Sequence, residues 1–188
     1  MGEPKALLRL GHSLQTLLEI VTTRLQSVAD ESFLVGQTDW DPPGSLAEVR
    51  RVHDAGQGAT HGVIAALEGA RFDLCIVAGC DMPFLDGRLL REMVSIGRGE
   101  EKGVTVHDPT GLHPLQTVYR RADLAQITLM VREGHRSLTA ISSAVSMYRL
   151  DVGETGRLDE YRWAVFNANT PGDLVTARRH AAGDGVPP

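Results

Sequence analysis

The sequence predicts an α/β fold with a mostly parallel sheet, and three observations support that prediction. Short apolar runs alternate with segments in which apolar residues recur every three or four positions, as strands and helices alternate in βαβ units. One apolar run, 74–78, is followed by Asp81 and Pro83, as expected for a buried strand that stops at a sheet edge. Polar residues follow three of the predicted strands, at Asp54, at Asp81, and at Asn167 with Asn169.

The first half of the chain carries the pattern of two helices and three strands. Apolar residues from Leu14 to Val28 are spaced for a helix over 13–29, with Ser13 as its N-cap. A strand over 32–35 ends at a glycine, and a loop rich in Asp, Pro and Gly follows. We then expect a strand over 47–53, a glycine-rich turn over 56–62, a helix over 63–68 or slightly beyond, and the strand 74–78.

The second half continues the alternation. Asp86 begins a helix over 87–96, and strands are expected over 104–106 and 113–119. A helix over 122–133 ends at Gly134, and a short helix over 137–144 leads to a strand over 146–151. Residues 166–169 are expected to form the end of a strand. The last helix begins with Thr170 as its N-cap and Pro171 in its first turn.

Composition narrows the class of protein. The chain has 188 residues, 42% hydrophobic and 23% charged, which suits one domain over 1–182 with a flexible tail over 183–188. The formal net charge of −5 gives no support to nucleic-acid binding. Two cysteines that flank one strand, Cys75 and Cys80, fit a reducing compartment. We expect a cytoplasmic protein without a membrane association, because no apolar stretch matches a membrane span and no signal peptide is recognisable.

Asp81 is the first candidate functional residue. Ligands of open α/β sheets bind at the carboxyl ends of strands, and a carboxylate there suits Mg²⁺ beside a nucleoside triphosphate. Taken alone, Asp81 fits a cap of the following helix equally well. The polar endings at Asp54 and Asn167 favour a site, because such endings converge on one sheet edge, although Asn at a strand end also makes turns.

Four segments resemble molybdenum cofactor guanylyltransferases, which are nucleotidyltransferases with a three-layer Rossmann-like fold. They are Lys5-Ala6-Leu7-Leu8, which resembles the end of the N-terminal signature; Gly79-Cys80-Asp81-Met82-Pro83-Phe84, the metal-binding motif; His113-Pro114-Leu115 with Val118-Tyr119; and 166–174, the Asn-x-Asn-Thr-Pro-x-Asp-Leu ending. Segment 134–138 is a weaker match. The resemblance covers essentially the whole chain, and the Asp81 motif is shared by several nucleotidyltransferases.

The resemblance implies roles for nine residues. Asp81 would bind Mg²⁺ and through it the phosphates of GTP, and Lys5 would contact the triphosphate, so that both would be catalytic. At the nucleotide, the resemblance also implies Asp54, Gly56 and Gly58. The residues implied near molybdopterin are His113, Arg136, Asn167 and Asn169. Plain alternatives exist: Lys5 and Arg136 as surface residues, and His113 as an extended residue before proline.

The implied reaction transfers GMP from GTP to molybdopterin and releases pyrophosphate. The phosphate monoester of molybdopterin is already anionic near neutral pH, so no Ser, Cys or His is needed as nucleophile or base. The protein aligns the reactants and neutralises charge. Accordingly, the sequence shows no Ser-His-Asp or Cys-His arrangement, and its seven histidines lack zinc-type spacing. Transient contact with molybdoenzymes or other cofactor-synthesis proteins is a further implied partnership.

The N-terminus departs from the family pattern. The family's first strand and Gly-rich loop stand ahead of the position of Lys5, and only Met1, Gly2, Glu3 and Pro4 stand there in this sequence. Such a strand is central in a doubly wound sheet, and such a loop grips phosphates. Either the sequence starts at an internal methionine of a longer protein, which we favour because the downstream motifs are intact, or this form has reduced or lost activity.

Two alternative functions stay open. One is a related nucleotidyltransferase that uses CTP or another triphosphate with a different phosphorylated acceptor, because residues 36–37 and 58–62 differ from the family pattern on the nucleotide side. The other is a module that binds the cofactor without transferring a nucleotide. The sequence fixes neither the oligomeric state nor the form of the acceptor.

Overall fold

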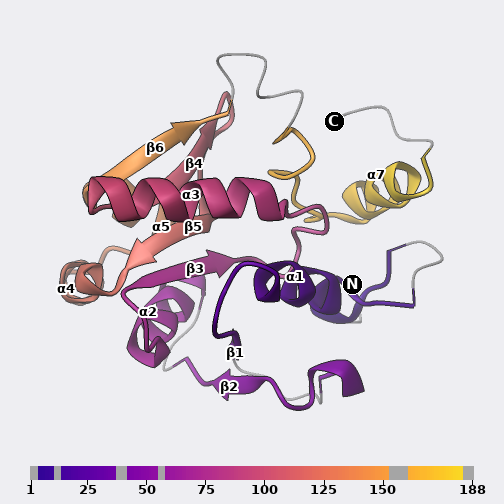
Figure 1. The fold of residues 1–188 in the computed structure, drawn as a ribbon, viewed down its shortest axis with the longest axis horizontal. Helices are drawn as coiled ribbons and strands as arrows, with labels where there is room; N and C mark the ends of the chain where they lie inside the picture. Colours follow the sequence, from indigo (N-terminus) through magenta and orange to yellow (C-terminus); the bar gives the residue numbers. More distant parts are fainter. Residues whose placement is uncertain (1–3, 11–13, 37–41, 55–57, 153–160, 184–188) are drawn as a thin grey trace.

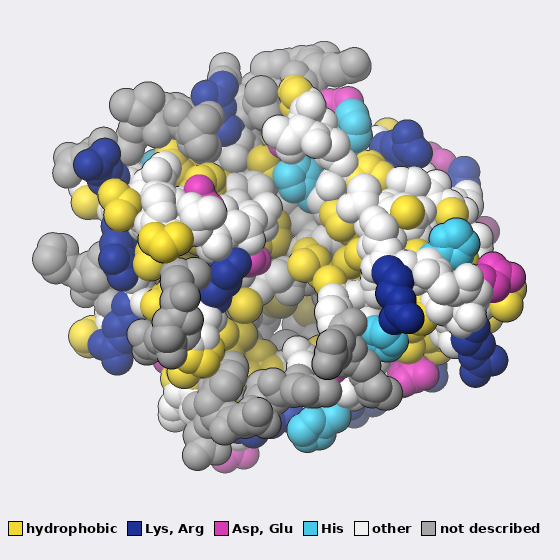
Figure 2. Space-filling view, turned by 180° about the vertical axis from the view of Figure 1, so that it is seen from behind, with side chains coloured by type: hydrophobic (Ala, Val, Ile, Leu, Met, Phe, Trp, Pro, Cys, Tyr) yellow, Lys and Arg dark blue, Asp and Glu magenta, His cyan; other side chains and the backbone are white. Residues whose placement is uncertain are grey.

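The computed structural model describes residues 4–10, 14–36, 42–54, 58–152 and 161–183. Its strands form two sheets (Figure 1). The larger sheet has the order β3-β5-β4-β6, with β3 at Leu74–Ala78, β4 at Gly103–Asp108, β5 at Gly111–Arg120 and β6 at Met147–Asp151. The smaller sheet pairs β1 (Phe33–Val35) with β2 (Arg50–Val52). A cavity of about 850 Å³ lies between β1 and β3, and the face seen in Figure 2 is hollowed near its middle, with hydrophobic side chains around the hollow.

The prediction of a mostly parallel sheet needs one correction. The pairs β1–β2 and β4–β6 are parallel, but β5 runs antiparallel to both of its neighbours, β3 and β4. Only Pro109 and Thr110 connect β4 to β5. A connection of two residues can join antiparallel strands only, because a parallel pair needs a long crossover.

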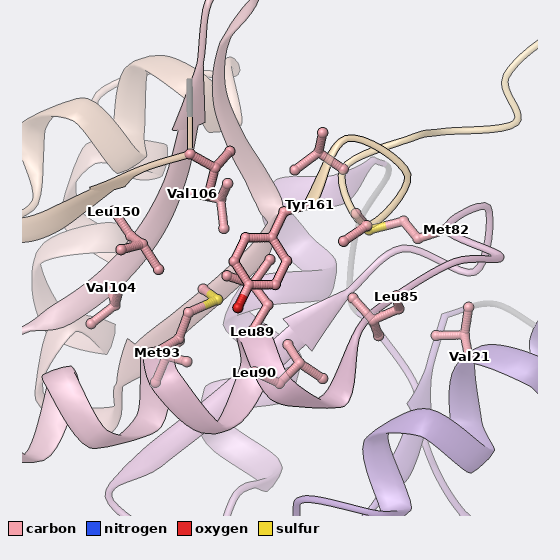
Figure 3. Close-up of a cluster of buried hydrophobic side chains, with 14 residues drawn as sticks. Val21, Met82, Leu85, Leu89, Leu90, Met93, Val104, Val106, Leu150 and Tyr161 are labelled. Carbon is pink, nitrogen blue, oxygen red and sulfur yellow. The ribbon is translucent and has the colours of Figure 1, made fainter. Parts of the chain in front are cut away.

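Helices cover both faces of the larger sheet and produce three layers. On one face, α3 (Gly87–Glu100) packs Leu89, Leu90 and Met93 onto β4, β5 and β6, and all three side chains are fully buried (Figure 3). On the other face lie α2 (Ala59–Gly69), α4 (Leu124–Arg132) and α5 (Leu138–Ala144). Successive residues of β5 serve the two layers, since Val118 faces α3 and Tyr119 faces the other helices.

The helix ends follow from capping, and several of them differ from the prediction. Helix α1 spans Leu17–Gln26, because Thr16 and Glu19 form a capping box there; the predicted cap, Ser13, lies outside the described residues. Helix α2 begins four residues earlier than expected, with Gly58 at its N-cap. A 3₁₀ turn, Arg121–Asp123, precedes α4. Asp86 caps α3 as predicted, and Ser137, predicted as the first residue of α5, is its N-cap instead.

Residues 166–169 do not form a strand, contrary to the prediction. This segment crosses the end of β3, where the Ala168 amide donates to the Asp81 carbonyl at 2.8 Å. It then enters α7 (Pro171–Ala181), which has Thr170 as N-cap and Pro171 at its start, as predicted. One backbone hydrogen bond between these two segments cannot build a strand ladder. The apolar residues of 166–169 pack into the core instead. None of the described helices combines the length and the apolar character that a membrane crossing requires.

Candidate active site

The loop after β3 places Asp81 at the carboxyl end of the strand. The Gly79 amide donates to the Leu115 carbonyl of β5 at 3.0 Å, which fixes the start of the loop. A Cβ atom on Gly79 would lie 2.6 Å from Oδ1 of Asp81. Glycine is therefore the residue that lets the Asp81 carboxylate fold back over the strand end. The Asp81 side chain retains 20% exposure, so a ligand can reach it.

Lys5 reaches the same point from the other end of the chain. It lies in the 3₁₀ turn η1 (Lys5–Leu7), and its Nζ is 3.2 Å from Oδ1 of Asn169 and 3.9 Å from Oδ2 of Asp81. The ammonium group is thus held between a carboxylate and an amide oxygen while 37% of the side chain stays exposed. A cation in this position can neutralise a phosphate that approaches the strand end.

The start of α7 positions Asn169. The Asp173 carboxylate accepts from the Asn169 amide at 3.0 Å and from the Thr170 amide at 2.7 Å, so the capping box of α7 holds the backbone of Asn169. Asn167 behaves differently, because its Nδ2 donates to the Val165 carbonyl at 3.1 Å. That local bond is the turn-forming use of Asn, whereas the Asn169 amide oxygen points to Lys5.

Asp54 and Gly58 border the cavity that also reaches Gly79 and Asp81. Asp54 follows β2, and its Oδ1 is buried without a hydrogen-bond partner among the described residues. Gly58 caps α2 with φ of 89°, a conformation that favours glycine, so α2 begins at a residue that lines this cavity. Gly56, the third residue predicted for the nucleotide side, lies outside the described residues.

His113 lies further along the same edge. Its Nε2 is 3.1 Å from Oδ2 of Asp108, and the two side chains are only 12% and 7% exposed. Burial raises the pKa of Asp108, but hydrogen bonds from Thr110 and the adjacent His113 ring outweigh burial and bring the pKa below its ordinary value. His113 thus lies in a buried contact with the Asp108 carboxylate at the β4–β5 hairpin, and this contact is separate from those of Lys5.

Arg136 is exposed and stands beside the first turn of α2. Its backbone carbonyl accepts from the Thr60 hydroxyl at 3.2 Å. The structure thus brings Lys5, Asp81 and Asn169 into direct contact, places Asp54 and Gly58 on the adjoining cavity, and holds His113 and Arg136 through other partners.

Two residues of this edge escaped the sequence analysis. Asp108 ends a strand, as Asp81 follows one, so the same signal could have identified it. The steric need for glycine at position 79 has no such signal, because it depends on where the Asp81 side chain turns.

Burial, with a smaller effect of the Asp81 charge, raises the pKa of Cys80 to about 11. That thiol is therefore protonated at neutral pH and is not a nucleophile.

The oxygen ligands at Asp81 suit a hard cation that keeps most of the water molecules in its coordination shell. No cluster of three or more His, Cys, Asp or Glu side chains able to hold a metal occurs among the described residues. Mg²⁺ does not need one, because it binds proteins through one or two carboxylates and completes its octahedron with waters and substrate phosphates. One accessible carboxylate beside an amide oxygen and a lysine fits that mode.

Comparisons with known proteins identify the family of the chain. The sequence profile of the MobA-like NTP transferase domain matches residues 1–147. The chain is 33% identical over 180 residues to the probable molybdenum cofactor guanylyltransferase of Pelotomaculum thermopropionicum, a match that covers 95% of this chain and 85% of that protein.

Two solved structures show the same fold. The molybdopterin-guanine dinucleotide biosynthesis protein A of Archaeoglobus fulgidus superposes with a TM-score of 0.76 and 22% identity, covering 97% of this chain and 92% of that one. The 2-C-methyl-D-erythritol 4-phosphate cytidylyltransferase of Thermus thermophilus superposes with a TM-score of 0.69 and 18% identity, covering 95% and 94%. At these identities the superpositions show the fold alone, and they confirm the predicted Rossmann-like nucleotidyltransferase architecture.

Proposed function

The chain belongs to the family of MobA-like NTP transferase domains, and from this premise we propose that it transfers GMP from GTP to molybdopterin and releases pyrophosphate. The observation that carries the proposal is the contact of the Lys5 ammonium group with both Asp81 and Asn169 at the end of β3. A cation, a carboxylate and an amide at one strand end are what a triphosphate with its metal ion requires.

The nucleotide side is assigned to Lys5, Asp81, Asp54, Gly56 and Gly58. Asp81 would hold Mg²⁺, which when bound neutralises phosphate charge. Lys5 would move from its partners to the triphosphate and add a second positive charge. The unpartnered oxygen of Asp54 offers an acceptor for a donor group of the nucleoside. The start of α2 lies at the same cavity, and the dipole at a helix N-terminus favours anionic groups.

The acceptor side is assigned to Asn169, Asn167, His113 and Arg136. A phosphate oxygen of molybdopterin attacks the α-phosphorus of GTP, and the bond from that phosphorus to the bridging oxygen of pyrophosphate breaks. The attacking oxygen is anionic, so no proton has to be removed. Asn169 and Lys5 orient the phosphates in line, and the Arg136 guanidinium supplies charge for the molybdopterin phosphate.

Calorimetric titration of the chain with GTP, CTP and ATP, each with Mg²⁺, tests the assignment of the nucleotide. We expect selective binding of GTP. Selective binding of CTP would favour a cytidylyltransferase, because the same fold also occurs in an enzyme of that name. Absence of binding to any nucleotide by the folded chain, with molybdopterin still bound, would favour a cofactor-binding module.

Turnover of an Asp81→Asn variant tests the metal and phosphate site. Pyrophosphate release in the presence of GTP, Mg²⁺ and molybdopterin should fall by about 100-fold or more, because the substitution removes the charge that holds the cation. Glu68→Gln, which neutralises an exposed carboxylate of α2, is the matched control and should leave turnover unchanged. Equal turnover of the two variants would contradict the assignment of Asp81.

A further inference from the structure

A second cavity, of about 430 Å³, lies between the end of α1, the start of α3 and the end of α7. Its volume falls within the range of about 300–1,000 Å³ that small-molecule sites in proteins have. None of its described lining residues borders the cavity beside Asp81, and none has been assigned to GTP or molybdopterin. A role for this second cavity must therefore come from its own lining.

The lining of the second cavity is positively charged, although the chain as a whole has a formal net charge of −5. Arg24 and Arg91 are exposed and have no ion-pair partner in the part of the chain that the structure describes. Arg88 differs, because its guanidinium donates to the Asp86 carboxylate at 2.9 Å, and Asp86 is the one carboxylate among the described lining residues. Two positive charges thus stay uncompensated, and a cleft lined by charges of one sign attracts ligands of the opposite sign.

The two uncompensated arginines come from helices that pack closely against each other. A Cβ atom on Gly87 would lie 3.3 Å from Oγ of Ser27 and 3.5 Å from Nη1 of Arg91. The Arg91 guanidinium therefore lies over the start of α3, beside the end of α1. Arg24 stands three residues before Ser27, so the two share one face of the chain there, and the Ser27 hydroxyl donates to the Arg24 carbonyl at 2.7 Å. Helix packing thus brings both cations to one cavity.

Three aromatic side chains form another part of the lining. The ring centroids of Trp163 and His180 are 3.5 Å apart and their planes differ by 8°, so the two rings stack. The centroid of Phe84 lies 5.1 Å from that of Trp163 and 4.7 Å from that of His180, in T-shaped contacts. All three side chains are half-buried. Burial lowers the pKa of His180, so its ring is uncharged at neutral pH and adds aromatic surface to the cavity.

We propose that this second cavity binds a small phosphate ester, with its phosphate between the Arg24 and Arg91 guanidinium groups and its apolar or aromatic body against the rings. A phosphate monoester carries a charge of about −1.5 to −2 at pH 7, which matches the two uncompensated cations. Guanidinium groups also fit phosphate oxygens in a bidentate geometry. A lone anion would leave the aromatic wall uncovered, and a neutral aromatic ligand would leave both charges unmatched.

Nuclear magnetic resonance of the ¹⁵N-labelled chain with phenyl phosphate as the probe tests this site. The readout is the indole N–H signal of Trp163, which a Trp40→Phe variant distinguishes from the second tryptophan of the chain. We expect a saturable shift of this signal in the absence of Mg²⁺, with a Kd below about 1 mM. Inorganic phosphate, which lacks the ring, should bind at least about tenfold more weakly.

Charge-neutralising variants locate the phosphate. Arg24→Gln and Arg91→Gln should each raise the Kd for phenyl phosphate about tenfold, because each removes charge-assisted hydrogen bonds. Arg132→Gln, which removes an exposed arginine of α4 away from the cavity, is the matched control and should leave the Kd unchanged. Lys5→Gln should also leave it unchanged, because Lys5 does not line this cavity. Spectra of the unliganded variants confirm that each is folded.

Four results would overturn the proposal. They are an unchanged Trp163 signal at millimolar phenyl phosphate, an equal rise in Kd for Arg132→Gln, a loss of binding in Lys5→Gln, and equal affinity for inorganic phosphate. The second would reduce the binding to general charge attraction, and the third would place the ligand in the active site. The fourth would mean that the cavity takes an anion without using its aromatic wall.

Discussion

The two edges of β3 differ in a way that divides the molecule. Toward β5, five residue pairs from Leu74↔Arg120 to Ala78↔Gln116 close a continuous ladder beneath fully buried side chains of α3. Toward β1, no described strand pairs with β3, and its edge borders a cavity. The four strands of the larger sheet are therefore joined to one another by backbone hydrogen bonds, whereas the β1–β2 half is attached to them mainly through side-chain packing by α1 and α2.

The candidate site straddles this division. Asp81 and His113 come from the four-stranded half, but Asp54 and Gly58 come from the side of the cavity that β1 and β2 form. Polar contacts add some attachment, since the Arg50 guanidinium donates to the Gly69 carbonyl at 2.8 Å and to Glu31 at 3.0 Å. Asp81 thus follows a strand that is paired along its whole length with β5, whereas Asp54 and Gly58 come from segments that pair with no strand of the larger sheet among the described residues.

The largest expected effect on stability comes from replacing leucine by alanine either in the core beneath α3 or at the cavity. Leu89→Ala removes a fully buried side chain of α3 and should lower the free energy of unfolding by about 3 kcal/mol. Leu25→Ala removes a half-buried side chain that lines the cavity and should cost about 1 kcal/mol, because its surroundings are already incomplete. Urea unfolding of both variants measures the difference; equal losses would mean that the two sides are equally packed.

The buried Asp108 carboxylate of the β4–β5 hairpin should make the four-stranded half sensitive to acid. Asp108→Asn should cost about 2 kcal/mol at pH 7, because it weakens charge-assisted hydrogen bonds. The pKa of Asp108 is lowered in the folded state, so its stabilising contribution is complete above the ordinary value of about 3.9 and is lost as pH falls through the lower folded value. The difference in stability between wild type and variant should therefore shrink below pH ~4.

A matched substitution controls the test of Asp108. Asp151→Asn breaks the ion pair with His107, in which the side chains are 34% and 37% exposed, and it should cost less than about 1 kcal/mol. Equal losses of stability for the two variants at pH 7 would show that the burial of Asp108 contributes nothing.

Gly79→Ala tests the boundary between the two halves. The new methyl group would collide with the Asp81 carboxylate and displace it, so turnover should fall by about tenfold, equivalent to about 1.4 kcal/mol. Gly99→Ala, in α3 and away from the cavity, is the control, because among the described residues no atom outside its own turn lies within 4 Å of the added Cβ, and alanine inside a helix should raise stability by up to about 1 kcal/mol. Steady-state kinetics on both variants distinguishes a local collision from a general effect of added methyl groups.

The smallest expected effect concerns Asn169. Asn169→Ala should reduce turnover by about threefold through loss of one hydrogen bond to Lys5, with little change in thermal stability. Asn167→Ala should lower thermal stability as well as turnover, because its amide donates to the Val165 carbonyl within the turn. If Asn169→Ala mainly lowered the melting temperature, Asn169 would be a turn residue as well. Its contact with Lys5 would then not contribute to the site.

Much of this architecture was predictable because its causes are local. The apolar run of β3, the N-caps Asp86 and Thr170, and the stop at Gly134 depend on neighbouring residues only, and each occurs where the sequence predicted it. The antiparallel β5 was missed because a two-residue connection leaves little sequence signal. The segment 166–169 was wrongly predicted as a strand end because apolar content does not distinguish packing from pairing.

The sequence alone determined the family, the order of the elements and the residue types at the strand ends, because short-range patterns and motifs record these. Only the tertiary structure decided that Lys5 lies against Asn169, 164 positions away, and that Gly79 must lack a side chain. It alone also decided that one edge of β3 is paired and the other open. These features depend on distances between segments far apart in the chain, and such distances are set when the layers pack, not by any local pattern.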